Sequence, residues 1–278
     1  KFIDSFQFNF YHLMKIFTNV VFNTVLCRQF DVYTMKQFRY DSPFILESGA
    51  RLQDLTIAYH TYGELNSDKS NVVWICHHLT ANSDAALWWQ GVVGNGYLID
   101  PSRYFIVCAN ILGSCYGSTG PLSNNPATGT PYYAEFPFIT VRDMVKAHIL
   151  FRQHLGIENI HLIIGGSMGG YQALEWCFAE KERIKNMVLL STSAAESAWG
   201  IAVHTAQRLA IEADCSWKDP SPNAGQKGLK AARAIGLLSY RNHGILVKKQ
   251  TDEDNSKTDN FRASSYMEYQ GEKLVKRF

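Results

Sequence analysis

The chain has 278 residues, of which 46% are hydrophobic and 19% charged, and its formal net charge is +2. This length accommodates one large α/β domain or two small ones, and the hydrophobic content is typical of a protein with a core. A near-neutral charge without a basic block excludes an obvious nucleic-acid-binding surface, and no apolar run approaches the length of a membrane span. The six cysteines lack C-x-x-C spacing, and Cys76 and Cys108 lie in apolar runs, so we expect reduced thiols in a cytoplasmic protein.

Residues 1–34 are rich in Phe, Asn and Tyr and show weak periodicity. A signal peptide would need a cleaner apolar centre than residues 10–26, which polar and charged side chains interrupt. A more regular pattern begins at Met35, which is a candidate for the true start. We therefore expect 1–34 to be an N-terminal extension without a role in function.

Strand-like runs come next. Residues 44–46 and 55–62 predict two strands joined through the turn at 47–50. Val72–Cys76 and Tyr104–Ala109 are continuous apolar runs, which are typical of parallel strands covered on both faces.

A helix follows these strands. Thr140 and Asp143 form a variant capping box, and the apolar spacing predicts a helix that reaches about Leu155, where Gly156 ends it. Met187–Ser191 predicts one more strand. The alternation of strands and helices across residues 35–196 predicts an α/β core. Residues 197–278 instead predict a helical region, with helices at 197–213, at about 224–235 and from 261 onward, and no further strand.

The most informative stretch is Ile160–Gly170, an apolar run followed by a serine among glycines. Gly165-x-Ser167-x-Gly169 lies between a predicted strand and a predicted helix, which is the setting of a nucleophile elbow. Glycines at the flanking positions avoid collisions at such a strained turn. Ser167 is therefore the candidate nucleophile, and the alternative is a glycine-rich turn with an idle serine.

A serine nucleophile also needs donors for the oxyanion and a base. The backbone N–H of Met168, directly after the serine, is the first expected donor, and the loop His77–Asn82 after the Val72–Cys76 strand should supply the second. We interpret His77 and His78 as residues that shape this loop, because the base of such a fold comes later in the chain.

The base itself is not evident. The only histidines after Ser167 are His204 and His243, both in the helical region, and the acids there do not follow strands. We expect the Asp and His of a triad beyond Phe278, so that the chain would be a fragment without its last strands; His204 or His243 as base is the alternative. The glycine-rich segment 113–121 lacks the lysine of a phosphate loop, and Cys115 within it is a weaker nucleophile candidate.

Three segments together resemble the homoserine O-acetyltransferase family, which has an α/β-hydrolase fold: the elbow Gly165–Gly170, the loop His77–Asp84 and the run Asn110–Pro121. The similarity extends from about Met35 to Phe278. It implies a mostly parallel central sheet in residues 35–196 and a helical lid in residues 197–278. Within the loop this chain has His78 where the family usually has alanine, which places different side-chain packing there.

The resemblance implies an acetyl transfer in methionine biosynthesis. Ser167 would take the acetyl group from the co-substrate acetyl-CoA, with the Leu79 and Met168 amides on the oxyanion, and L-homoserine would then accept it. Arg208 matches the lid arginine that binds the substrate carboxylate, a role that suits a guanidinium. The resemblance also implies a homodimer, and we expect no bound metal or other cofactor.

Other functions stay open at this stage. A succinyl donor, a serine acceptor or a serine esterase would use the same fold and nucleophile. A chain without its triad Asp and His would instead be an inactive fragment that binds or dimerises.

Overall fold

The computed structural model describes residues 34–278, and the chain divides into two compact units. The first contains the described residues up to Arg39 together with Thr56–Ile111 and Thr140–Thr192. The second contains Tyr40–Leu55, Leu112–Ile139 and Ser193–Phe278. The expected N-terminal extension lies almost entirely outside the described residues, and the proposed boundary at residue 196 stays a prediction.

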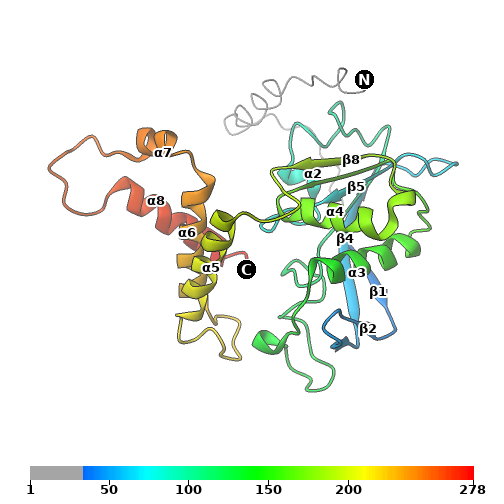
Figure 1. Ribbon diagram of the computed structural model, residues 1–278, viewed down its shortest axis with the longest axis horizontal. Coiled ribbons are helices and arrows are strands. Elements are labelled where there is room, and N and C mark those ends of the chain that lie inside the picture. Colours follow the sequence, from blue (N-terminus) through cyan, green and yellow to red (C-terminus); the bar gives the residue numbers. More distant parts are fainter. Residues whose placement is uncertain (1–33) are drawn as a thin grey trace. The chain divides into compact units, whose positions relative to one another are not determined.

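A six-stranded sheet organises the first unit, in the order β1-β4-β6-β5-β7-β8 (Figure 1). Its strands are β1 (Lys36–Tyr40), β4 (Leu55–Tyr62), β5 (Val72–Cys76), β6 (Phe105–Ala109), β7 (Leu162–Gly166) and β8 (Met187–Leu190). Strand β4 runs antiparallel to β6, whereas β5 is parallel to both β6 and β7, and β7 is parallel to β8. The expected mostly parallel sheet is therefore confirmed.

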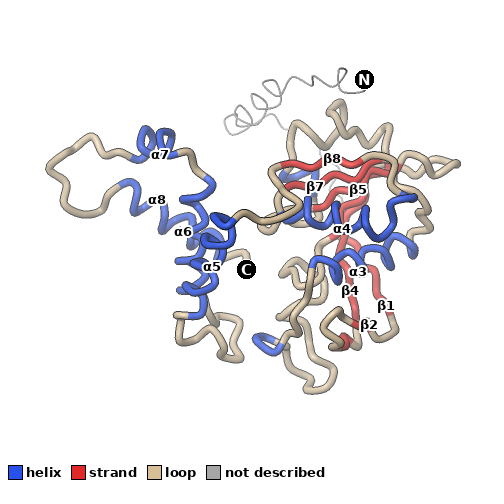
Figure 2. The backbone as a smooth tube through the Cα atoms, viewed as in Figure 1, coloured by secondary structure: helices blue, strands red, loops and turns tan. Residues whose placement is uncertain are grey.

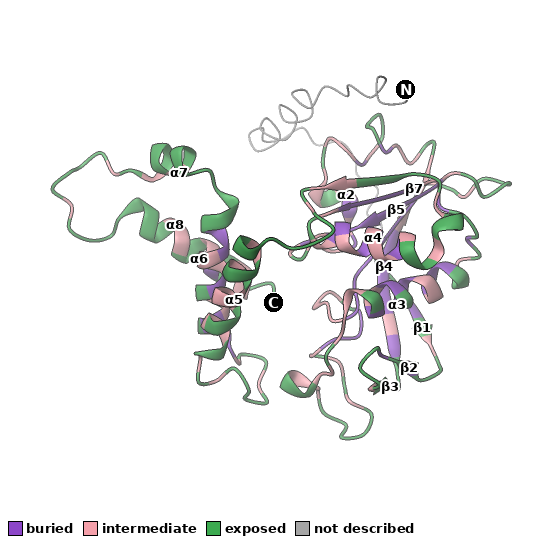
Figure 3. Ribbon diagram, viewed as in Figure 1, coloured by how far each residue is buried: buried purple, intermediate pink, exposed green. Residues whose placement is uncertain are grey.

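One face of this sheet is covered by helices α3 (Val141–His154) and α4 (Met168–Glu180), which Figure 2 shows in front of the strands. Trp74 of β5 is fully buried there, with its ring centroid 4.8 Å from that of Trp176 and 5.6 Å from that of Phe151. All five residues of β5 are buried, as Figure 3 shows by colour. This agrees with the continuous apolar run that predicted a strand covered on both faces.

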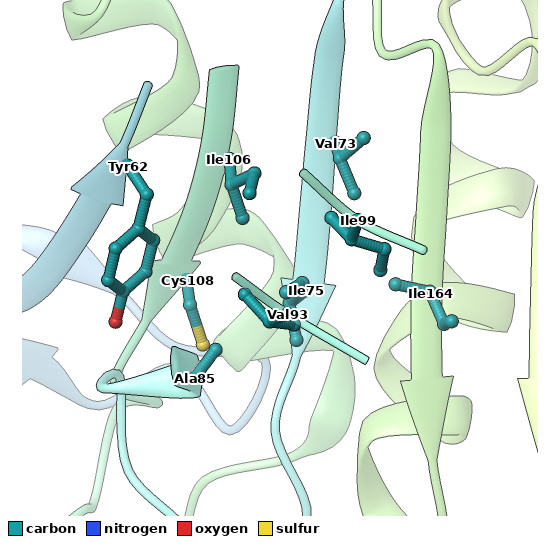
Figure 4. Packing of buried hydrophobic residues seen from close by; sticks show 9 residues of the cluster. All are labelled: Tyr62, Val73, Ile75, Ala85, Val93, Ile99, Ile106, Cys108 and Ile164. Carbon is teal, nitrogen blue, oxygen red and sulfur yellow. The ribbon is translucent and has the colours of Figure 1, made fainter. Parts of the chain in front are cut away.

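The opposite face packs against the segment that follows β5. Val73 and Ile75 alternate with Trp74 along the strand, so they point to this second face. Figure 4 shows them with Val93 and Ile99, which come from the loop after the short helix α2 (Ala85–Trp88). Val93 and Ile99 thus anchor the later part of the segment between β5 and β6 in the core.

Helix α3 begins where the capping box predicted. The Asp143 N–H donates to Thr140 Oγ1 at 3.2 Å, and the Thr140 N–H donates to Asp143 Oδ2 at 3.0 Å. Both halves of the capping box are present, so two otherwise unpaired donors of the first turn are satisfied. Gly156, with a φ of +64°, ends the helix as expected.

Helices dominate the second unit: α5 (Ala198–Glu212), α6 (Gln226–Tyr240), α7 (His243–Gln250) and α8 (Arg262–Val275). Helices α5 and α6 approach closely, because a Cβ added at Gly228 would lie 2.6 Å from the Cα of Ile211. Among the described residues, no helix is long and apolar enough to cross a membrane.

Several details differ from the sequence prediction, and neither strand β1 nor the short helix α2 was predicted. The strand at Phe44–Ile45 (β2) pairs with Arg51–Leu52 (β3) in a small hairpin, whereas Leu55–Tyr62 joins the main sheet. Helix α6 continues to Tyr240 instead of ending near Ile235. Helix α7 was not predicted, although Asn242 caps it by accepting the Ile245 N–H, which is a recognisable start signal.

The capping box gives a direct test of what stabilises α3. We expect Thr140→Ala to lower the free energy of unfolding by about 1 kcal/mol, because the first turn loses its side-chain acceptor. Thr140→Ser keeps the hydroxyl and should lose much less. Chemical denaturation of the three proteins measures this, and equal losses in both variants would contradict the role of the hydroxyl.

Candidate active site

Ser167 lies at the turn between β7 and α4, as the motif predicted. Its backbone has φ 53° and ψ −123°, a conformation that costs a non-glycine residue energy, and its side chain is exposed. Among the described residues, it is one of five non-glycine residues with a positive φ. The strand–turn–helix geometry of a nucleophile elbow is therefore present, while the role of Ser167 as nucleophile stays a prediction.

The glycines around Ser167 allow close backbone contacts. A Cβ at Gly165 would overlap the Gly169 carbonyl across the turn. A Cβ at Gly169 would overlap the carbonyl of Cys76, which is the last residue of β5. A Cβ at Gly170 would lie 2.6 Å from the Cβ of Thr192. The first turn of α4 is thus packed backbone to backbone against the end of β5, where the loop 77–84 begins.

Two backbone amides at this junction are available as donors. Within residues 34–278, neither the Met168 N–H nor the Leu79 N–H has a hydrogen-bond partner. By contrast, the Ser167 N–H donates to the Leu190 carbonyl at 3.0 Å, and the Gly170 N–H donates to the Ser167 carbonyl at 2.9 Å. The N-terminus of a thirteen-residue helix adds the positive end of its dipole at the same place.

The loop 77–84 is fixed at its far end by a buried polar network. The Ser83 N–H donates to Asn110 Oδ1 at 2.7 Å, and Asn110 Nδ2 donates to Ser83 Oγ at 2.9 Å. The His60 ring contacts the same hydroxyl, with 2.8 Å between Nδ1 and Oγ. Sequence reasoning missed this network, because its three members come from separate segments and no local pattern links them.

At its near end the loop is held by His77, whose ring is almost fully buried. Its Nδ1–H donates to the His78 carbonyl at 2.9 Å, since a carbonyl can only accept. Burial lowers the pKa of His77 to about 4, so the ring is neutral near pH 7. This environment fits the interpretation of His77 as a loop-shaping residue.

Some of the late histidines and acids have local partners. His204 on α5 pairs through Nδ1 with Glu196, and His243 is the first residue of α7. The Asp214 carboxylate accepts from the Gly228 N–H at 2.9 Å and from Ser216 Oγ at 2.8 Å, and these bonds lower its pKa to about 2. These contacts give His204 and Asp214 local structural roles, and His204 or His243 as base stays an untested alternative.

Two further candidates lie in the second unit. Arg208 is exposed on α5 and donates from Nη2 to Thr205 Oγ1 at 2.9 Å, so its guanidinium retains free donors in the described structure. Cys115 donates its thiol to the Arg277 carbonyl at 3.4 Å, and burial raises its pKa, which keeps it protonated. Within the part of the chain that is described, no group of three His, Cys, Asp or Glu residues could hold a metal ion.

Comparison with known proteins decides the family. A family model described as alpha/beta hydrolase fold matches residues 71–214. The homoserine O-acetyltransferase of Cyclobacterium marinum is 46% identical over 245 residues, which are 88% of this chain and 70% of that protein. The chain belongs to the homoserine O-acetyltransferase family.

Solved structures agree on the fold of this family member. The homoserine O-acetyltransferase of Bacillus anthracis matches with a TM-score of 0.79 and 24% identity, covering 89% of this chain and 72% of that one. Esterase E22 matches nearly as well, with a TM-score of 0.77 and 22% identity over 88% of this chain and 74% of that one. At such identities the likeness shows the α/β-hydrolase fold and does not separate transferase from esterase.

The contact of Gly169 with β5 can be tested by adding one methyl group. We expect Gly169→Ala to destabilise the protein by about 1–3 kcal/mol, because the new Cβ overlaps backbone that cannot move without shifting the loop after β5. Gly166→Ala is the matched control, since its Cβ would lie 3.5 Å from the Leu190 carbonyl in ordinary contact. Thermal unfolding compares the two, and equal stability of both variants would contradict the close packing.

The buried histidines predict how stability depends on pH. His77 and His148 both have pKa values lowered to about 4 by burial, from an ordinary value of 6.5. The unfolded chain binds protons first, so the free energy of unfolding is highest above pH 6.5 and falls as the pH drops toward 4.

A variant isolates one of these two groups. His148→Gln retains a donor for the Asn110 carbonyl, which lies 3.4 Å from His148 Nε2. Between the two pKa values we expect the slope to fall by about 1.4 kcal/mol per pH unit, the equivalent of one proton. Denaturation series from pH 4 to 8 measure it, and an unchanged slope would rule out His148 as a titrating group.

Proposed function

We propose that this chain transfers an acetyl group from acetyl-CoA to the hydroxyl of L-homoserine, with Ser167 as the nucleophile. The observation that carries the proposal is the backbone of Ser167, which holds an exposed hydroxyl in a strained turn at the N-terminus of α4. The sequence similarity to homoserine O-acetyltransferases supplies the substrates.

The reaction proceeds in two half-reactions. In the first, Ser167 Oγ gives up its proton and forms a bond to the acetyl carbon, the bond from that carbon to sulfur breaks, and the departing CoA thiolate takes up that proton. In the second, the homoserine hydroxyl gives up its proton and its oxygen forms a bond to the same carbon, the ester bond to Ser167 breaks, and Ser167 Oγ takes up that proton. Each half-reaction passes through a tetrahedral intermediate with a negative oxygen.

The Met168 and Leu79 amides are the proposed donors to that oxygen. Both N–H groups lack a partner within residues 34–278. Met168 directly follows Ser167, and Leu79 lies in the loop that begins where β5 contacts the first turn of α4. A preorganised donor of this kind contributes about 3–4 kcal/mol to the transition state.

Arg208 is the proposed partner of the homoserine carboxylate. An exposed guanidinium with unused donors suits a carboxylate, with which it can form two parallel hydrogen bonds. We also infer a cytoplasmic homodimer, as the family resemblance implies; the five free cysteines of the described residues are compatible with that compartment.

Mass spectrometry of the intact protein after incubation with acetyl-CoA tests the nucleophile. We expect one acetyl group on Ser167, and its loss when L-homoserine is added, with formation of O-acetylhomoserine. Ser167→Ala should lower transfer by about 10³-fold or more, because no other described hydroxyl replaces the nucleophile. Ser265→Ala, at an exposed serine of α8, is the matched control.

The same assay separates the alternatives. An esterase would release acetate at the same rate with and without homoserine, and a succinyltransferase would form the adduct from succinyl-CoA in preference. Arg208→Ala should leave acetylation of Ser167 unchanged and raise the KM for homoserine about 10- to 100-fold, as expected for loss of a charged hydrogen bond. An unchanged KM would remove Arg208 from the site.

A further inference from the structure

The peptide between His78 and Leu79 carries one of the two proposed oxyanion donors. No peptide bond is cis in the described part of the chain, so the carbonyl of His78 and the N–H of Leu79 point in opposite directions across one plane. Whatever holds the His78 carbonyl therefore also aims the Leu79 N–H.

The ring of His77 holds that carbonyl. His77 Nδ1 lies 2.9 Å from the His78 oxygen, and a carbonyl oxygen only accepts, so Nδ1 carries the proton. His77 is 1% exposed, and its other ring nitrogen, Nε2, has no partner within residues 34–278. A neutral ring has one N–H, and here it is committed to the His78 carbonyl.

Gln172 holds the backbone of His77. It is completely buried on α4, one turn after Met168. Its Nε2 lies 3.3 Å from the His77 carbonyl and 3.4 Å from the Met168 carbonyl. Because both carbonyl oxygens can only accept, the NH2 group of the amide must point toward them. The side chain thereby links the loop after β5 to the helix that begins at the elbow.

We propose that His77 is a positioning residue for acyl transfer: by binding the carbonyl of His78 it fixes the direction of the Leu79 N–H, while Gln172 ties the same loop to the elbow helix. The inference rests on the proposed function for the reaction that benefits. The hydrogen bond from His77 to the His78 carbonyl, which we call the brace, is a property of the fold, and its effect on the loop can be measured without substrate.

Two substitutions of similar size distinguish the effect of the hydrogen bond on the rate from the effect of side-chain volume. His77→Asn places an amide nitrogen close to the position of Nδ1, whereas His77→Leu fills the same space without a donor. We expect His77→Leu to acetylate Ser167 about 10- to 100-fold more slowly, approaching the loss of one oxyanion donor. The KM for acetyl-CoA should change little, and His77→Asn should recover most of the rate.

A purely structural role would give a different pattern. Asn and Leu have the same number of side-chain heavy atoms, so a loss of packing would slow both variants to a similar extent and lower their unfolding temperatures together. Phe151→Leu, in the core of α3, reports how far lost core packing alone affects the rate. Equal acetylation rates in the Asn and Leu variants would overturn the proposal.

A second variant and a second readout keep the test decisive. His77→Gln places its amide nitrogen near the position of Nε2 and should be slow like Leu; a wild-type rate would overturn the brace. Amide hydrogen exchange of residues 77–82 should be faster in the Leu and Gln variants than in Asn. If the unmodified protein forms no acetyl adduct, the proposed function fails, while the exchange data still decide whether His77 holds the loop.

Discussion

The close contact between Gly169 and the end of β5 is the constraint on which the rest of the site depends. A backbone that carried any side chain at this position would push α4 away from the Cys76 carbonyl. Because Ser167 begins the same helix turn and the loop 77–84 begins at the same carbonyl, one contact sets the distance between nucleophile and loop. The buried strands β5 and β7, paired residue by residue from Val73 to Cys76, make both sides of that contact rigid.

Several buried polar atoms of the first unit lack a hydrogen-bond partner, and this lowers the stability of the fold. Within residues 34–278, Trp74 Nε1, His77 Nε2, His148 Nδ1 and Gln172 Oε1 are buried without a hydrogen-bond partner. Each such group costs about 1–3 kcal/mol relative to a satisfied one. The rings of Trp74 and His148 lie 6.1 Å apart. Two of these residues, His77 and Gln172, use their other polar atom to hold the loop after β5.

The sequence predicted those parts of the fold that are written in local patterns. The elbow glycines, the capping box of α3 and the apolar runs of β5 and β6 all act over a few residues, and the structure contains each of them. The partner of strand β2 could not be read in this way, since pairing depends on turn geometry and on competition with the main sheet. The bond from His77 to the His78 carbonyl was equally hidden, because a sequence does not say which way a peptide plane turns.

The neutrality of His77 limits what it can contribute to the pH dependence of transfer. With a pKa of about 4, the ring does not change its charge between pH 5 and 8, and protonation at Nε2 would leave the Nδ1 donor in place. If His77 fixes the direction of the Leu79 N–H, that direction should not change with the charge of the ring in the neutral range. We therefore expect no ionisation of His77 near pH 7 in the acetylation rate. Oxyanion stabilisation by the Leu79 N–H should therefore not depend on pH in the neutral range. Substitutions at His77 should change the rate of acetylation without changing the pH at which the proton transfer from Ser167 titrates.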